Sequence, residues 1–154
     1  DAGFALCIWG DPITGKYLSD PALDDIEDLN EYMDLLRHLN DSTDCYYMIA
    51  EDKATCQPIG TCCAVVKENG SCWDIGYCIH PTCWRKGYAK EMVQALVQFG
   101  KQSGVKTFLA DVAAENAGSC AVMRALGFAP AENGTFHRSG SSTEYKNLTF
   151  QKDL

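Results

Sequence analysis

The stretch that decides the fold runs from Asp74 to Gly104 and reads DIGYCIHPTCWRKGYAKEMVQALVQFGKQSG. Its beginning continues an alternation in which every second side chain is aromatic or β-branched: Trp73, Ile75, Tyr77 and Ile79. A period of two with such residues is typical of a half-buried strand. Proline lacks the N–H that a sheet ladder needs, so Pro81 ends the predicted strand.

The second half of the stretch has the period of a helix. Small and apolar residues recur there at spacings of three and four: Ala89, Met92, Val93, Leu96, Val97 and Gly100. One face of an amphipathic helix has this spacing. The helix is therefore predicted to run from Ala89 towards Gly104, a residue suited to the left-handed conformation just past a helix end.

The loop between strand and helix carries Arg85, Lys86 and Gly87. Backbone N–H groups, the positive end of the helix dipole and two cations meet here, which favours a phosphate or pyrophosphate. Because Gly87 has no side chain, a ligand could approach the backbone closely. The alternative is an ordinary strand-to-helix connection with solvated basic residues, since one glycine beside two cations is a weak motif.

Downstream segments extend the pattern. A second alternating strand (Lys106 to Val112) precedes Asn116-Ala117-Gly118-Ser119, a short helix and Gly127-Phe128. The ordered set, from about Tyr47 to Phe128, resembles the GNAT superfamily of acyl-CoA-dependent N-acyltransferases, and most of all its branch of ribosomal-protein N-terminal acetyltransferases. The segments that carry the resemblance are Ile75-Gly76-Tyr77, Pro81, Trp84-x-Lys86-Gly87-Tyr88-Ala89 and Asn116-x-x-Ser119.

The resemblance implies an α+β fold of three layers. Its sheet is mixed and mostly antiparallel, helices flank it, and two central strands splay apart. Residues 1–154 are expected to form a single domain of this kind, with no linker or repeat. The family normally opens with a strand, which appears to be missing before Phe4, so one sheet edge is expected to be exposed.

The remaining elements follow from pattern and turn chemistry. Glu68-Asn69-Gly70 predicts a hairpin turn because Asn-Gly tolerates positive φ. A helix is predicted to begin at Pro21, since acidic residues crowd its first turns and suit the helix dipole. The predicted strands are Tyr46 to Glu51, Ile59 to Lys67, Cys72 to Ile79, and a final hairpin of Pro130 to Arg138 and Thr143 to Gln151.

Composition limits the partners. The chain has 154 residues and a net charge of −8, which argues against nucleic acid or an anionic membrane as partner. Its nine cysteines form no framework spacing and no secretory signal is visible, so reduced thiols in the cytoplasm are expected. A metal site built from Cys72, Cys78, His80 and Cys83 is the alternative, but no Cys-x-x-Cys pair occurs and no metal is predicted.

The resemblance places acetyl-CoA, as the acyl donor, between the two splayed strands. Its pantetheine amides are expected to pair with the backbone of Tyr77, Cys78 and Ile79. The pyrophosphate is expected on the N–H groups of Trp84, Arg85, Lys86, Gly87, Tyr88 and Ala89. Asn116 has a structural role as a helix N-cap, and by resemblance it also hydrogen-bonds the cofactor arm.

The resemblance also implies direct attack of an amine on the thioester, with strand N–H groups stabilising the oxyanion. Ser119 is expected to bind or protonate the leaving sulfur; the alternative is that its side chain faces the helix interior. Many relatives carry a tyrosine acid seven residues after the asparagine, where this chain has Met123. Asp74 matches a position that is often acidic and is the predicted base, with Glu115 and His80 as further candidates.

The predicted function is therefore acetyl transfer to a primary amine, either a protein N-terminal α-amine or a small molecule. A non-catalytic acyl-CoA-binding sensor is the alternative, suggested by Met123 and the missing strand. A metal- or thiol-based protein is the third. Homodimers are common in the resembling branch, so a homodimer is a further expectation.

Overall fold

The computed structural model describes residues 2–18, 30–31, 33–34, 37, 41, 44–137 and 143–154. Within these ranges, six strands form one sheet in the order β1-β2-β3-β4-β6-β5. The strands are β1 (Cys45–Glu51), β2 (Pro58–Lys67), β3 (Cys72–Ile79), β4 (Thr107–Ala113), β5 (Ala129–His137) and β6 (Glu144–Asp153). The helices are α1 (Ala2–Trp9), α3 (Tyr88–Gln102) and α4 (Ala117–Ala125), with 3-10 turns η1 (Gly15–Tyr17), η2 (Glu68–Gly70) and η3 (Pro81–Cys83).

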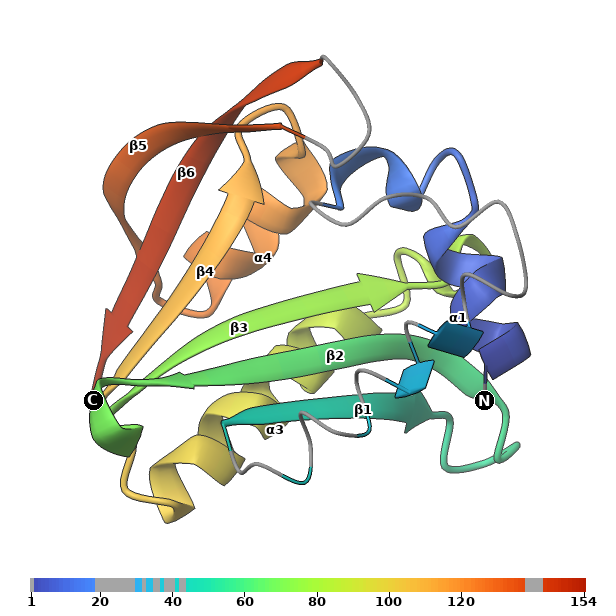
Figure 1. Ribbon diagram of the computed structural model, residues 1–154, viewed down its shortest axis with the longest axis horizontal. Coiled ribbons are helices and arrows are strands. Elements are labelled where there is room, and N and C mark those ends of the chain that lie inside the picture. Colours follow the sequence, from blue (N-terminus) through green and yellow to red (C-terminus); the bar gives the residue numbers. More distant parts are fainter. Residues whose placement is uncertain are drawn as a thin grey trace.

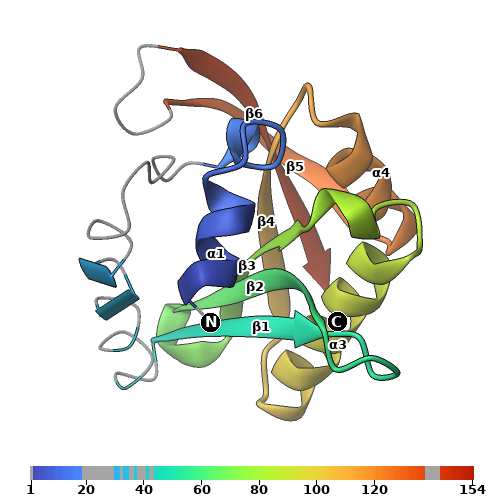
Figure 2. The same cartoon turned by 90° about the vertical axis from the view of Figure 1, so that its right-hand side faces the viewer.

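The elements form three layers. Helices α3 and α4 cover one face of the sheet, and α1 lies on the opposite face (Figures 1 and 2). All neighbouring strands pair antiparallel except β3 and β4, which are parallel. The predicted α+β class with a mixed, mostly antiparallel sheet is confirmed.

The β1-β2-β3 meander follows the predicted turn chemistry. Asn69 in η2 has φ +54° and ψ +35°, so it uses the left-handed conformation expected of an Asn-Gly turn. The pairing of β5 with β6 likewise confirms the predicted final hairpin.

The core lies between the sheet and α3. Trp73 and Ile75 of β3 are buried on the same side as Val93 and Leu96 of α3, as the two periodicities predict. Fully burying one such aliphatic or aromatic side chain stabilises the fold by about 1.5–3 kcal/mol. This packing fixes the position of the strand and the helix between which the Arg85-Lys86-Gly87 loop runs.

Helix α3 ends as its sequence predicts. Gly104 has φ +88°, the Val105 N–H donates to the Gly100 carbonyl at 2.9 Å, and the Gly104 N–H donates to the Lys101 carbonyl at 3.2 Å. These two bonds form a Schellman motif, which satisfies carbonyls that the end of a helix leaves unpaired.

Strands β3 and β4 pair over three residues only. Cys72 to Asp74 face Thr107 to Leu109, and beyond this point the described strands form no further pairs with each other. Figure 1 shows the two ribbons diverging from there. The predicted splay of the central strands is confirmed, and it leaves one backbone edge of each strand open.

Two predicted elements cannot be compared with the described residues. The helix predicted from Pro21 lies almost entirely outside the described residues, as does the turn at residues 139–142. The described chain begins with α1, and β1 is the end strand of the sheet on its side. None of the described helices has the length and apolarity needed to span a bilayer.

Candidate functional site

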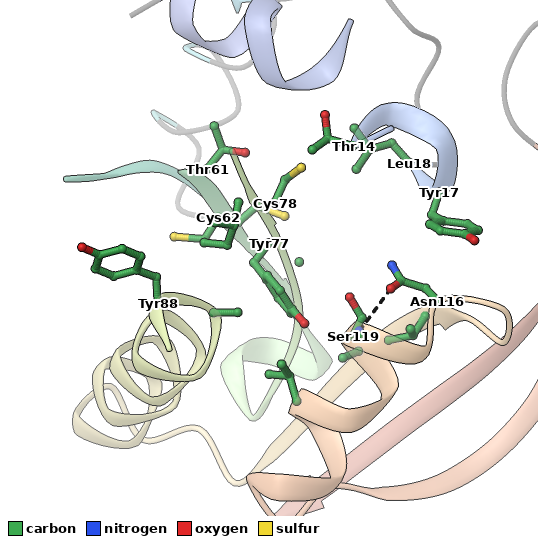
Figure 3. Close-up of a pocket in the computed structure, with 18 of the residues that line it drawn as sticks. Thr14, Tyr17, Leu18, Thr61, Cys62, Tyr77, Cys78, Tyr88, Asn116 and Ser119 are labelled. Atoms are coloured by element: carbon green, nitrogen blue, oxygen red, sulfur yellow. Dashed lines mark hydrogen bonds between the residues drawn. The ribbon is translucent and has the colours of Figure 1, made fainter. Parts of the chain in front are cut away.

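The open space between the diverging strands is part of a cavity of about 1500 Å³. We call its central part the cleft, formed by residues 75–79 of β3 and 110–113 of β4. The cavity also reaches the N-terminal ends of α3 and α4 and the segment after α1 (Figure 3). Its volume exceeds the several hundred Å³ typical of small-ligand pockets, so it can hold an extended ligand and a second reactant.

The β3 backbone offers free groups to this cleft. The His80 N–H donates to the Ile59 carbonyl at 2.9 Å, which fixes the phase of the β2–β3 ladder. Because an antiparallel ladder uses every second residue, Cys78 bonds towards β2 while the N–H groups of Tyr77 and Ile79 point towards the cleft. The Ile79 carbonyl accepts a bond from Trp84 Nε1 at 2.6 Å. Of the three residues predicted to meet a ligand backbone, Tyr77 and Ile79 have suitably directed amides.

The N-terminal end of α3 lies at one end of the cavity. Its N-cap residue is Gly87, with φ +90° and no side-chain cap, and a Cβ placed there would meet no atom within 4 Å. The helix begins with bonds from the Lys90 and Glu91 N–H groups to the Gly87 carbonyl. The preceding N–H groups of Gly87, Tyr88 and Ala89 are thus the unpaired donors of a helix start, which suit a phosphate.

The basic residues around this helix end differ in position. Arg85 adopts φ +63° and lines the cavity, as does Lys90 in the first turn of α3, whereas the exposed Lys86 does not. Trp84 and Tyr88, both predicted, also line it. Lys90 was missed because the motif ends at Ala89, although a further cation in the first turn of the predicted helix was a usable signal.

Two predicted residues lie at the N-terminal end of α4. Asn116 Oδ1 accepts the Ser119 N–H at 3.1 Å, which confirms the predicted N-cap. Both side chains line the cavity (Figure 3). The cap uses the amide oxygen of Asn116, and its NH₂ group is a chemically separate donor.

Met123 follows Ser119 by one helical turn and is fully buried in the core. The tyrosine that reaches this region comes instead from β3. Tyr77 extends towards the end of α4 that carries Ser119 (Figure 3). In the described part of the chain, the Tyr77 hydroxyl is the buried side-chain polar group without a hydrogen-bond partner.

Burial raises the pKa of Tyr77 above its ordinary value, and the Ser119 side chain acts in the opposite direction. The two hydroxyls therefore interact, but their arrangement does not meet the geometry of a hydrogen bond. The raised pKa keeps the phenol protonated and able to donate.

The candidate bases differ in whether their side chains line the cavity. Asp74, predicted as the base, forms an ion pair with Lys67 at 2.6 Å and does not line the cavity. The reason is its place along β3: Asp74 pairs with Leu109 in the last pair before β3 and β4 separate, so it lies outside the cleft. His80 also does not line the cavity; its ring accepts the Thr82 N–H.

Two other carboxylates do line the cavity: Glu115, a candidate from the sequence, and Asp111, which the sequence reasoning missed. Asp111 Oδ1 accepts bonds from Asn147 Nδ2 at 3.0 Å and Thr149 Oγ1 at 2.5 Å. These bonds hold the carboxylate at the cleft wall. The sequence offered one signal for Asp111: it lies in the predicted strand just before the Asn116-x-x-Ser119 motif.

The cysteines do not form a metal centre in the described residues, where no three His, Cys, Asp or Glu side chains are close enough to hold an ion. All nine are free thiols. Burial raises the pKa of Cys62 to about 11 and that of Cys78 to about 12. Such thiols are poor nucleophiles at neutral pH because little thiolate is present.

Comparisons with known proteins agree with this geometry. A family model described as an acetyltransferase (GNAT) domain matches residues 1–129. The uncharacterized N-acetyltransferase p20 of Bacillus licheniformis is 29% identical over 131 residues, which are 83% of this chain and 73% of that protein.

Two solved structures share the fold. One is the spermidine N-acetyltransferase of Vibrio cholerae in complex with CoA and spermine, with a TM-score of 0.85 at 15% identity. The match covers 99% of this chain and 89% of that chain. The ribosomal-protein-alanine N-acetyltransferase of Brucella melitensis has a TM-score of 0.77 at 20% identity, with coverages of 100% and 94%.

Proposed function

The chain belongs to the GNAT family of acetyltransferases, and from this premise we propose that it transfers the acetyl group of acetyl-CoA to a primary amine. The observation that carries the proposal is the cleft. Its β3 edge has unpaired amides at Tyr77 and Ile79, and the cavity continues to the uncapped helix end at Gly87. A linear amide-containing arm that ends in a diphosphate fits this order of groups.

The residues present suit that ligand. The diphosphate would lie on the N–H groups of Gly87, Tyr88 and Ala89, with Arg85 and Lys90 as nearby cations. The pantetheine amides would pair with the β3 backbone, and the Asn116 NH₂ group is available to the same arm. Acetyl-CoA would supply the acetyl group as a thioester.

The chain's own groups would then promote the transfer. The N–H groups of Tyr77 and Ile79 are directed into the cleft, where they would stabilise the oxyanion that forms as the amine attacks. Ser119 would meet the leaving sulfur. Much of the rate would come from holding two reactants together in one cavity.

A strong base is not required for every acceptor. About a tenth of an α-amine with pKa near 8 is neutral at pH 7, against well under a thousandth of a lysine amine. Glu115 and Asp111, which line the cavity, are the carboxylates we propose for attracting the amine or accepting its proton, in place of Asp74. The proposed acceptor is either a small-molecule amine or a protein N-terminal α-amine.

The decisive experiment incubates the purified protein with acetyl-CoA and a panel of polyamines, amino acids and peptides, and detects acetylated products by mass spectrometry. Product detection avoids interference from the nine protein thiols. Acetylated product with at least one amine supports the proposal. Tight acetyl-CoA binding without any product supports the non-catalytic acyl-CoA sensor, which the apolar Met123 favours.

We further propose that the protein works in the cytoplasm, since nine free thiols suit a reducing compartment. Whether it forms a homodimer stays a prediction for a measurement of mass in solution.

A further inference from the structure

The hydroxyl of Tyr77 is the feature of the site that the proposed function leaves unused. It is buried, and within the described residues it lacks a hydrogen-bond partner. A buried donor without a partner destabilises a fold, and Phe would fill nearly the same space without that cost. A hydroxyl in this situation indicates a group that bonds only in another state of the site.

The position of the hydroxyl indicates which group that is. Tyr77 crosses from β3 towards the first turn of α4, where Ser119 lines the cavity (Figure 3). The Tyr77 hydroxyl points towards Ser119 (Figure 3), and the lowering effect of the Ser119 side chain on the pKa of the phenol agrees with this proximity. A modest movement of either hydroxyl would complete a bond between them.

The same region of α4 lacks an acid of its own. Met123, one turn after Ser119, has no proton to donate and is enclosed in the core. Ser119 is left as the group that would face the sulfur in the proposed function, and a serine hydroxyl has a single hydrogen and two acceptor lone pairs. Within a helix, that hydrogen is easily lost to a backbone carbonyl one turn earlier.

We propose that Tyr77 is a positioning residue for acetyl transfer: its hydroxyl donates to Ser119 Oγ when the cleft is occupied and so directs the Ser119 hydrogen to the leaving sulfur. The inference rests on the proposed function. As the amine nitrogen bonds to the acetyl carbon, the C–S bond breaks and its electron pair passes to sulfur. The proton that the amine loses ends on the thiolate, and both hydroxyls keep their own hydrogens.

The test uses CoA and desulfo-CoA, which lacks the thiol, as probes, and it needs no acceptor. If the two hydroxyls stabilise the thiolate, the pKa of the bound CoA thiol falls and CoA affinity rises with pH, whereas desulfo-CoA affinity does not. For a thiol pKa lowered by one unit, the ratio of the two affinities should rise with pH, up to about tenfold at a pH well above the pKa of the free thiol.

Other ionisable groups near the site act on both probes, so the ratio removes the effect that the probes share, and comparison of wild type with Tyr77→Phe removes their coupling to the thiolate. They are Cys62 opposite Tyr77 on β2, Cys78 beside it, Cys120 on α4, and Asp111 and Glu115 at the cavity wall.

In Tyr77→Phe, the rise in the affinity ratio should disappear, desulfo-CoA should bind as in the wild type, and the melting temperature should be unchanged or higher. A preserved rise in the ratio would overturn the inference. A clearly lower melting temperature would overturn it as well, because the hydroxyl would then have a structural bond.

Kinetics give an independent readout once an amine substrate is found. The single-turnover rate at saturating amine should fall about tenfold in Tyr77→Phe, the order expected of one neutral hydrogen bond. It should not fall further when Ser119→Ala is combined with Tyr77→Phe than in Ser119→Ala alone. Multiplying effects would show that Tyr77 acts independently of Ser119 and would contradict the inference.

Tyr46→Phe is the matched control. Tyr46 packs against Trp73 and Phe99 on the neighbouring part of the sheet and does not line the cavity, so its loss of a hydroxyl should leave the rate and the affinity ratio unchanged. If wild-type protein binds CoA but acetylates no amine, the proposed function fails. If wild-type protein is active and Tyr77→Phe equals it, only the role of Tyr77 fails.

Discussion

Gly87 and Gly104 lie just outside the two ends of α3 in nearly the same backbone conformation, with φ +90° and +88°. A Cβ at either position would meet no atom within 4 Å, so alanine would add backbone strain but no clash. Each Gly→Ala change is expected to destabilise the fold by about 1–2 kcal/mol. Only Gly87 lines the cavity.

Gly87→Ala is therefore expected to weaken acetyl-CoA binding at least tenfold, because the methyl group would occupy space that the diphosphate needs. Isothermal titration calorimetry would measure the affinity, with Gly104→Ala as the control of equal strain. Equal affinities in the two variants would remove the phosphate site from this loop.

Asn116 allows its two roles to be separated. Asn116→Asp keeps the oxygen that caps α4 but replaces the NH₂ donor with a second oxygen. The free energy of unfolding should stay within about 0.5 kcal/mol, because Asn and Asp cap helices equally well. Acetyl-CoA affinity should fall several-fold. An unchanged affinity would reduce Asn116 to a structural residue, whereas Asn116→Ala should cost about 1 kcal/mol of stability.

Single residues also show how far sequence reasoning reaches. The Asn116 cap and the accessible Gly87 were predictable because each depends on local backbone chemistry. The pairing of Asp74 with Lys67 was not recognised, because it depends on the register between β2 and β3. The unpartnered Tyr77 hydroxyl could not be predicted, since it depends on how α4 packs on the sheet.

Among the elements, the turn between β1 and β2 is tied to the start of α3 by one contact. Tyr88 Oη donates to Asp52 Oδ2 at 2.5 Å, and the Ala54 and Thr55 N–H groups donate to Asp52 Oδ1. The bond from Tyr88, followed by those from Thr55, lowers the pKa of Asp52. The contact holds the first residue of α3 beside the proposed phosphate site.

Tyr88→Phe should raise the pKa of Asp52 towards its ordinary value, which a carboxyl NMR titration would measure. The sign follows from the lowered pKa: the contact stabilises the folded state above the ordinary pKa of Asp52 and is lost as pH falls through the folded value. Asp11 is the internal control, because the Thr14 N–H, not Tyr88, lowers its pKa. An unchanged Asp52 titration would show that the Tyr88 contact is not formed in solution.

The positions of the strands and helices around the core were largely predictable, because the strands show a period of two and the helix that packs on them shows a helical period. The Asn69 turn and the Schellman end at Gly104 agree with the predictions from their residues. The Asp52–Tyr88 contact was not predictable, because it joins residues 36 positions apart whose meeting depends on the tertiary fold.

For the whole molecule, the point where β3 and β4 part is the closed end of the cleft. Phe108 pairs with Trp73 in the last stretch before the strands separate, and it is fully buried. Phe108→Ala should lower the free energy of unfolding by about 3–5 kcal/mol, measured by urea denaturation, because a large cavity would replace the ring. Ile13→Ala, at a residue 60% exposed, should stay within about 0.5 kcal/mol. Similar values for both would contradict the assigned core.

The molecule as a whole is acidic, with a net charge of −8. This charge argues against nucleic acid or an anionic membrane as partner, but it does not identify a substrate. The overall arrangement and the splay were accessible through family resemblance, because the ordered motifs lie at the strand and helix ends that form the cleft. The acceptor could not be inferred, since the wall that would contact it combines side chains from several distant segments.

The proposed function requires a ligand backbone that enters between β3 and β4, and residue-resolved amide hydrogen exchange with and without CoA tests this most directly. The amides of Tyr77 and Ile79, together with those of residues 87–89, are expected to become protected when CoA binds. The Cys78 amide, already bonded towards β2, should change little. CoA binding that leaves Tyr77 and Ile79 exchanging as before would contradict the account.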